Sequence, residues 1–224
     1  MTDPNGRAGV WSIVLGGGSG ARFGGAKQFE RLGGLTLLGR SVAAAATVSA
    51  GVVVVVPGGE LPDDLLPPGL LRPGVSLLTA AAGAHRAASV RSGLAALPAC
   101  AEIVVVADAA HPLASPALFA RVVGAVRSGA GGALPGLPLT EVIAVVDADG
   151  TRIGGLPREG HVLVQLPHAF RADLLRAAHA GGEDGVEDST MVAALGARVV
   201  VVPGEPANLH ITTVAELALA ARLV

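Results

Sequence analysis

The sequence predicts an α/β fold with a Rossmann-like, doubly wound and mostly parallel sheet. Short valine-rich segments recur along the chain, and segments with helical periodicity separate them. Continuous apolar runs are typical of strands that helices cover on both faces. A glycine-rich run directly after the first of these strands is the third observation, because ligands of such folds bind where strands end and helices begin.

The elements expected from these patterns alternate in chain order. The predicted strands are Trp11–Leu15, Val52–Val56, Val75–Thr79, Ile103–Ala107, Ala133–Leu134, Val142–Asp147 and Val199–Val202. The predicted helices are Leu37–Ser49, Arg86–Leu97, Pro116–Ser128, Ala169–Ala178, Asp188–Leu195 and Val214–Leu223. This alternation favours βαβ units and therefore parallel pairing.

Residues 136–166 interrupt the alternation. They hold two extended stretches separated by the turn sequence Asp147–Gly150, and Asp-Gly between extended segments is typical of a β-hairpin. We predict an arm here that projects from the domain and pairs two subunits, because a projecting hairpin has edges to cover. A hairpin folded back on its own domain is the alternative.

Composition limits the functional classes. The 224 residues fit a single domain, 1–224; 51% of them are hydrophobic, 15% are charged, and the net charge is −2. Such a chain has no general attraction for nucleic acid or membranes. Cys100 is the only cysteine, which excludes an intrachain disulfide. No apolar run reaches the roughly 18 residues of a membrane span, and no signal-peptide pattern is present, so we expect a cytoplasmic protein.

The glycine run raises the question of its ligand. Residues 11–29 read WSIVLGGGSGARFGGAKQF. A Walker A loop is excluded because Gln28, not Ser or Thr, follows Lys27. A dinucleotide loop is disfavoured because Val52–Val56 is not followed by an acidic residue. The remaining interpretations are a triphosphate surrounded by backbone N–H groups and neutralised by Arg22 and Lys27, or a solvated surface turn.

Six regions, in order along the chain, carry a family resemblance. They are Leu15–Phe29, Gly83–Val90, Val106–Pro112, Ala133–Gly150 in part, Val164–Phe170 and Asn208–Thr213. These regions are similar to the motifs of the 2-C-methyl-D-erythritol 4-phosphate cytidylyltransferases, within the sugar-phosphate nucleotidyltransferase superfamily. The resemblance implies a dimeric enzyme of isoprenoid precursor synthesis that joins CTP to a polyol phosphate and releases pyrophosphate, with Mg²⁺ as cofactor.

The resemblance also assigns site residues. It implies catalytic roles for Arg22, Lys27, Arg158 and His210; nucleotide binding by Gly16, Gly17, Gly18, Gly20, Gly83, Arg86, Ser89, Asp108 and Ala109; acceptor binding by Asp108, His111, Arg158, Val186 and His210; and metal binding by Asp108. Mg²⁺ would be held mainly by triphosphate oxygens, since the sequence shows no carboxylate cage.

The acceptor half departs from the family pattern. His111 and His210 stand where the family has an arginine and a lysine, and Leu166 and Val186 replace two threonines. Only Arg158, which the resemblance places on the partner's arm, is unchanged. Imidazoles have an unperturbed pKa of about 6.5, so two permanent cations are lost. We therefore expect a divergent acceptor site.

The sequence leaves three functional hypotheses open. The first is the family reaction; the second is nucleotidyl transfer to a different polyol or sugar phosphate; the third is a nucleotide-binding paralogue without catalysis. The short spacing from Arg22 to Lys27 resembles that of the molybdenum-cofactor guanylyltransferases, which leaves GTP open as the nucleotide.

The remaining histidines and acids have mostly structural interpretations. His85 lies in the nucleotide segment and either faces the base or is solvated. We predict surface or core roles for His161, His168 and His179, and we predict that the acidic run Glu183, Asp184, Glu187 and Asp188 caps the following helix.

Overall fold

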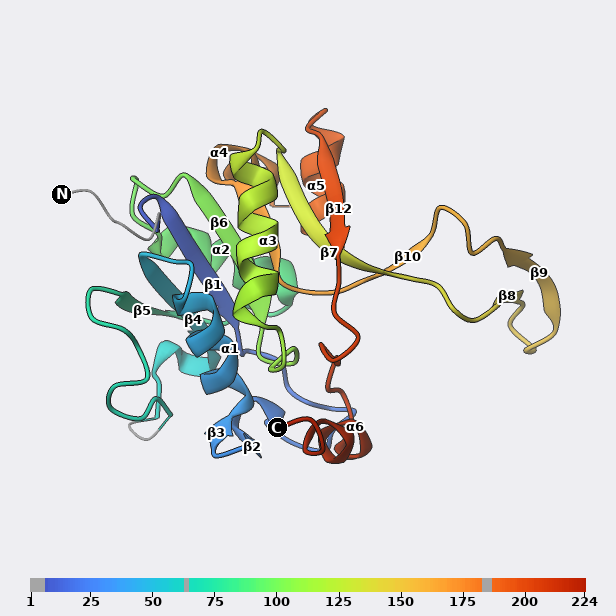
Figure 1. Cartoon of the computed structure of the whole chain (residues 1–224), viewed down its shortest axis with the longest axis horizontal. Coiled ribbons are helices and arrows are strands. Elements are labelled where there is room, and N and C mark those ends of the chain that lie inside the picture. The colour runs from blue at the N-terminus through green and yellow to red at the C-terminus, as the bar shows by residue number, and fades with distance from the viewer. Residues whose placement is uncertain (1–6, 63–64, 183–186) are drawn as a thin grey trace.

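A central eight-stranded sheet organises the protein. The computed structural model describes residues 7–62, 65–182 and 187–224 (Figure 1). The strands of the sheet are β1 (Val10–Leu15), β4 (Gly51–Val56), β5 (Ser76–Ala81), β6 (Ile103–Asp108), β7 (Gly132–Pro138), β10 (Val162–Val164), β11 (His168–Arg171) and β12 (Val199–Pro203). Their order is β10-β7-β11-β6-β1-β4-β5, and β12 pairs with β7.

Most of the pairing in this sheet is parallel, as expected. β6, β1, β4 and β5 pair in parallel, and so do β12 and β7. β11 is the exception at the centre, since it lies antiparallel between β6 and β7. The β1–β6 register places Leu15 beside Asp108, so the carboxyl ends of these two strands meet at one edge of the sheet.

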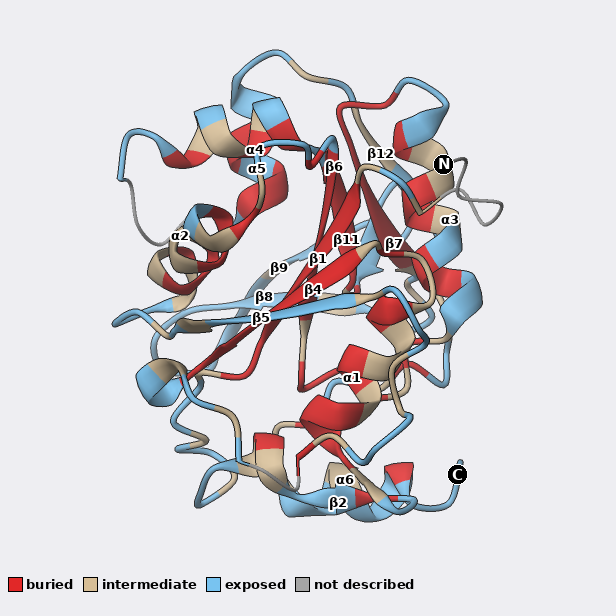
Figure 2. Cartoon of the chain, turned by 90° about the vertical axis from the view of Figure 1, so that its left-hand side faces the viewer, coloured by how far each residue is buried: buried red, intermediate tan, exposed pale blue. Residues whose placement is uncertain are grey.

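Helices cover both faces of the sheet (Figure 2). They are α1 (Leu37–Ala46), α2 (Arg86–Ala96), α3 (Pro116–Arg127), α4 (Ala172–His179), α5 (Asp188–Ala194) and α6 (Val214–Ala220), with 3₁₀ turns at Lys27–Phe29 and Pro57–Gly59. Val42 of α1 and Phe119 of α3 belong to one buried cluster, while Val90 of α2 and Leu175 of α4 belong to another. Two cores therefore lie on opposite faces of the sheet, which explains why its central strands are apolar throughout.

Local sequence signals begin several of these helices. Thr36 Oγ1 accepts the Gly39 N–H at the start of α1. Ser115 Oγ accepts the Leu118 N–H at the start of α3, directly before Pro116. Thr213 and Glu216 form a reciprocal capping box at the start of α6. Such caps satisfy N–H groups that have no partner within the helix.

The interrupting region forms an extended arm. β7 pairs with β10 at its base, and β8 (Ile143–Val146) pairs with β9 (Arg152–Leu156) at its tip, away from the main sheet (Figure 1). Asp147 Oδ1 accepts the N–H groups of Asp149 and Thr151 in the predicted turn. The hairpin signal of the sequence thus corresponds to β8 and β9. A second short pair, β2 (Arg31–Leu32) with β3 (Leu35–Thr36), precedes α1.

The prediction of one helix over Ala169–Ala178 is wrong at its start. His168–Arg171 is strand β11, and the helix begins only at Ala172. Phe170 is fully buried where β11 pairs with β6 and β7, so the sheet determines the conformation of this segment. The prediction of a two-residue strand at Ala133–Leu134 was also too short, since β7 spans seven residues.

Candidate functional site: two adjoining cavities at the carboxyl ends of β1 and β6

The first cavity, of about 420 Å³, lies where β1 and β6 end. Backbone and side chains from the glycine loop, the start of α2 and the end of β6 line it. Its lining residues are Leu15, Gly16, Gly17, Gly18, Ser19, Lys27, Gln28, Gly83, Ala84, His85, Arg86, Ser89, Asp108 and Ala109.

Glycine is required at two positions of the loop. A Cβ on Gly17 would lie 2.3 Å from the Ala82 Cβ, so the backbone of the loop packs directly against the end of β5. Gly20 has a φ of +66°, and a Cβ there would lie 1.7 Å from the Gly25 carbonyl oxygen. That tight turn brings the chain back toward the cavity at Lys27.

Lys27 connects the glycine loop to the C-terminal segment. It is the only lysine in the chain, and its Nζ donates to the Ile211 carbonyl oxygen at 2.7 Å. Partial burial lowers the pKa of Lys27 below its usual value, with Asp108 opposing this change and Arg22 adding to it. An ammonium has three N–H donors, so this contact leaves two for a ligand.

Asp108 is the last residue of β6 and lines the same cavity. Its Oδ1 accepts the Ala110 N–H at 2.7 Å, which fixes the orientation of the carboxylate. In the described part of the chain, no three His, Cys, Asp or Glu side chains cluster as a metal site. Asp108 alone suits a divalent cation whose remaining ligands are phosphate oxygens and water.

The start of α2 forms the opposite wall. Ser89 Oγ accepts the Gly83 N–H at 3.1 Å and holds the preceding turn. His85 is the N-cap residue of α2, and its Nδ1 accepts the Ala88 N–H at 3.3 Å. His85 therefore both lines the cavity and caps the helix, a role that its position in the sequence did not reveal.

A second cavity, of about 480 Å³, adjoins the first through Arg86, which lines both. Its walls come from β7, the β10–β11 segment and the chain after β12. The other lining residues are His111, Leu137, Leu163, Val164, Gln165, Leu166, His168, Glu187, Pro206, Asn208, Leu209 and His210.

Two histidines stack in this second cavity. The rings of His111 and His210 are parallel within 12°, with centroids 4.6 Å apart. His111 is buried, and its Nδ1 makes no hydrogen bond within the described residues. Burial, and then the proximity of His210, lowers the pKa of His111 to about 3; burial also lowers the pKa of His210. At neutral pH this pair is therefore uncharged.

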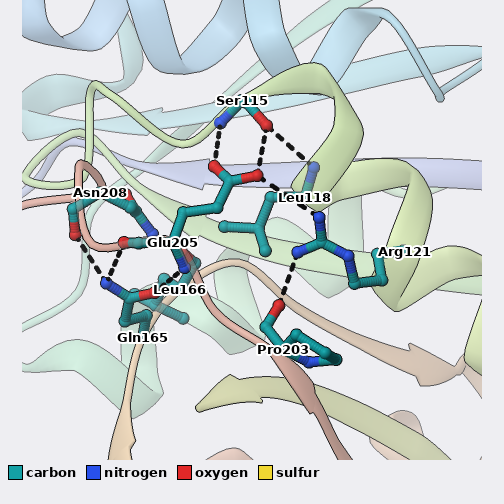
Figure 3. Close-up of polar contacts among 8 residues, drawn as sticks. All are labelled: Ser115, Leu118, Arg121, Gln165, Leu166, Pro203, Glu205 and Asn208. Atoms are coloured by element: carbon teal, nitrogen blue, oxygen red, sulfur yellow. Dashed lines mark hydrogen bonds and ion pairs between the residues drawn. The ribbon is translucent and has the colours of Figure 1, made fainter. Parts of the chain in front are cut away.

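A polar network places the segment that carries His210 (Figure 3). The Gln165 side chain donates to the backbone carbonyls of Glu205 and Asn208 and accepts from the Glu205 N–H. The Glu205 carboxylate in turn accepts from Ser115 Oγ at 2.7 Å. Asn208 Nδ2 donates to the Leu166 carbonyl oxygen at 2.7 Å, which ties the segment to the β10–β11 connection.

Several residues assigned by resemblance do not line either cavity. Gly20 shapes the loop, and Arg22 is exposed near its tip. Arg158 is exposed on the arm, where a guanidinium nitrogen donates to the Thr140 carbonyl oxygen at 3.1 Å. Val186, together with Glu183 and Asp184 of the acidic run, lies outside the described residues.

The prediction for the acidic run is correct in position, since Glu187 and Asp188 lie at the N-terminus of α5, but wrong for capping by the Glu187 side chain. Glu187 is the N-cap residue of α5 but makes no side-chain cap. It accepts from Ser189 Oγ and contacts His168 Nδ1 at 3.1 Å. Asp188 is fully buried and paired with Arg86. Sequence reasoning also missed Gln28 and His168 as cavity-lining residues, because both are buried side chains without a distinctive local pattern.

Comparisons with known proteins identify the family. A family profile described as "IspD: 2-C-methyl-D-erythritol 4-phosphate cytidylyltransferase" matches residues 10–224. An enzyme of that name from Nocardia farcinica is 36% identical, covering all of this chain and 97% of its own length. A crystal structure of the Thermus thermophilus enzyme superposes with a TM-score of 0.76 at 34% identity, covering 94% of this chain and 96% of that one.

Other relatives are longer. The bifunctional IspD/IspF enzyme of Solidesulfovibrio magneticus is 38% identical over 93% of this chain, which spans only 56% of the relative's length. The Nocardia farcinica and Thermus thermophilus enzymes, in contrast, match nearly end to end. The chain therefore belongs to the 2-C-methyl-D-erythritol 4-phosphate cytidylyltransferase family, and it is a CTP-dependent cytidylyltransferase of isoprenoid precursor synthesis.

Proposed function

We propose that each of the two adjoining cavities binds one substrate, with CTP in the first cavity and the acceptor phosphate in the second. The observation that carries this assignment is that Arg86 lines both cavities, so their ligands would meet at one wall. The backbone of Gly18 is open to phosphate oxygens, because a Cβ on this residue would meet no atom within 4 Å.

The chemistry needs orientation and charge rather than a covalent enzyme intermediate. An oxygen of the acceptor phosphate attacks the α-phosphorus of CTP, a new P–O bond forms, and the bond to the bridging oxygen of the β-phosphate breaks. Pyrophosphate leaves with that oxygen. Negative charge develops around the α-phosphorus and the leaving group, where Lys27 supplies positive charge. Arg22 lines neither cavity but is close enough to lower the pKa of Lys27, and it would add positive charge from the loop. Lys27 is held toward the cavity by its bond to Ile211.

We assign the nucleotide contacts to the glycine loop and the start of α2. Gly16, Gly17, Gly18 and the turn at Gly83 offer backbone N–H groups, with Arg86, Ser89, Asp108 and Ala109 around them. Asp108 would hold Mg²⁺ together with the phosphates. When bound, Mg²⁺ neutralises charge on the triphosphate.

The acceptor site differs from the family pattern in charge. Neutral His111 and His210 would donate N–H groups to the acceptor phosphate, in place of two permanent cations. The Nδ1 of His111, which has no hydrogen-bond partner among the described residues, supports this role, since a buried polar atom without a partner is uncommon. Leu166 and its apolar neighbours line the remainder of the cavity.

The exposed apolar side chains of the arm are the observation that favours a homodimer. Val142, Ile153 and Val146 are 75%, 65% and 55% exposed on the arm, so three large apolar side chains of one hairpin contact solvent. Covering this surface with a second subunit would carry Arg158 toward the partner's acceptor cavity. We propose that Arg158 completes the site in this way.

No helix in the described ranges has the length and apolar character to cross a bilayer. The lone cysteine, Cys100, is exposed, which suits a reducing compartment, and we propose the cytoplasm.

The direct test is pyrophosphate release with CTP, Mg²⁺ and 2-C-methyl-D-erythritol 4-phosphate, with GTP as the control nucleotide. We expect release with CTP and little with GTP. Release with other phosphorylated polyols instead would assign the histidine pair to a changed acceptor. Binding of CTP without turnover of any acceptor would contradict a catalytic role.

A further inference from the structure

A fully buried carboxylate lies behind the wall that the two cavities share. Asp188 begins α5, and its side chain has no exposed surface. Its Oδ2 lies 2.7 Å from a terminal guanidinium nitrogen of Arg86, and its Oδ1 accepts from His179 Nε2 at 3.0 Å. One carboxylate thus joins α2, α4 and α5.

Asp188 is ionised at neutral pH. Burial raises the pKa of this carboxyl, but the hydrogen bond from His179 and the charge of Arg86 lower it further, so the pKa lies below its usual value. A buried charge is costly unless it is paired. Here Oδ1 is hydrogen-bonded by His179, and Oδ2 is in ion-pair contact with Arg86 without hydrogen-bond geometry. Glu187, the neighbouring carboxylate, contacts His168 instead.

Arg86 is the exposed member of this pair. Its side chain is 37% exposed and lines both cavities, while one terminal nitrogen is held from behind. A guanidinium carries five N–H donors in one rigid plane, so a single fixed nitrogen restricts the direction of the others. An unrestrained arginine would lose rotamer freedom each time it bound a phosphate.

We propose that Asp188 is a positioning residue that holds the Arg86 guanidinium toward substrate phosphoryl oxygens at the junction of the two cavities. This inference rests on the proposed assignment of the cavities to CTP and the acceptor phosphate. His179 acts behind Asp188, since its N–H fixes the second carboxylate oxygen. The competing explanation is a purely structural ion pair between α2 and α5. A positioning role predicts that loss of Asp188 weakens substrate binding in the folded protein, whereas a purely structural role does not.

The Asp188→Asn variant distinguishes the positioning role from a purely structural ion pair. An asparagine oxygen can still accept from His179, but its NH₂ group would face the Arg86 donors and displace them. We expect kcat/KM and the calorimetric affinity for CTP to fall by about 10-fold to 100-fold, the range of one hydrogen bond to a charged group. Circular dichroism would show the folded state in each preparation.

Asp173→Asn is the matched control. Asp173 also pairs with an arginine, Arg171, at 2.6 Å, but both side chains are more than half exposed and they lie outside both cavities. The same chemical change there should leave kcat/KM and CTP affinity unchanged. Loss of activity in both variants would therefore indicate a general effect of removing an ion pair and overturn the inference.

A double-mutant cycle tests whether Asp188 affects catalysis through Arg86. In an Arg86→Ala background, Asp188→Asn should cost little further kcat/KM, because the group that it positions is gone. Additive losses in the two backgrounds, or unchanged kcat/KM in folded Asp188→Asn, would overturn the proposal. Absence of pyrophosphate release from the unaltered enzyme would instead contradict the proposed function.

A measurement on the unaltered protein covers the case in which Asp188→Asn does not fold. In protein labelled with ¹⁵N-arginine and assigned with Arg86→Lys, a guanidinium held by Asp188 should rotate slowly and show resolved Nη–H signals. A freely rotating Arg86 guanidinium would contradict the positioning role.

Discussion

His111 shows how one buried side chain makes the protein sensitive to acid. In the folded state its pKa is lowered to about 3, whereas an unfolded histidine titrates near 6.5. Between these values the unfolded state binds more protons, so stability decreases as the pH falls from about 6.5 toward 3. His210 and His168, whose pKa values burial also lowers, act in the same direction.

We predict that His111→Asn reduces this loss of stability. Urea unfolding of the variant and the unaltered protein, from about pH 7.5 down to about pH 5, measures it where most carboxylates remain ionised. The free energy of unfolding should fall less steeply with decreasing pH in the variant. His161→Asn, at an exposed histidine of the arm, serves as the control. Equal slopes for His111→Asn and the unaltered protein would contradict the assignment.

The sequence indicated what some side chains could do, but not which side chains they would contact. The glycine run predicted Lys27 as a phosphate-site residue and the family resemblance predicted Asp108, and both line the first cavity. The stacking of His111 on His210 could not, because these residues are 99 positions apart in the printed sequence and meet only when the segment after β12 crosses the end of β6.

Among the secondary-structure elements, those of the arm have the clearest effect on the free energy of subunit association. Its tip strands β8 and β9 pair only with each other among the described residues, and their apolar side chains are exposed. Apolar burial contributes about 25 cal/mol per Å², so covering these side chains would favour association. The hairpin of the arm was also predicted correctly, because the Asp147–Gly150 turn is visible in the sequence.

We predict that replacing Val142 and Ile153 by serine weakens the dimer. Each lost apolar side chain removes roughly 1.5–3 kcal/mol of burial, so dissociation should become at least about 10-fold easier. Sedimentation equilibrium at micromolar concentration measures the change. Leu195→Ser, at an exposed leucine following α5, is the control. A monomeric unaltered protein would contradict the proposed homodimer.

Helix and strand assignments succeeded where local patterns dominate. α1 and α3 begin at residues with visible capping chemistry. β11 was misread because Phe170 and its neighbours have a pattern compatible with either a helix or a strand, and their pairing with two distant strands determined the outcome. A short apolar segment does not reveal which strands will flank it.

For the whole molecule, the proposed site depends on two subunits. Lys27 and Asp108 belong to the globular part, while Arg158 lies on the arm. If Arg158 acts on the partner's cavity, a mixed dimer of Lys27→Ala and Arg158→Ala chains contains one site with both residues intact. If it acts on its own cavity, the mixed dimer contains none.

We predict that these two inactive variants complement each other. Lys27→Ala alone should lower kcat by about 10²–10³-fold, because a cation at the transition state is removed. After subunit exchange at equal amounts, half of the dimers are mixed and pyrophosphate release should recover to about one quarter of the unaltered rate. No recovery, with exchange verified by differently tagged chains, would place Arg158 outside the partner's site.

The α/β class, the order of most elements, the glycine loop and its two cations could all be predicted from the amino-acid sequence. These features depend on periodicity and on residue types within a few positions, which the chain displays directly. Three other features appear only in the folded chain. Arg86 lines two cavities with Asp188 behind it, two histidines stack, and Arg158 lies apart from both cavities of its own chain. Each of these depends on the order of strands in the sheet, which sets neighbours that no local pattern records.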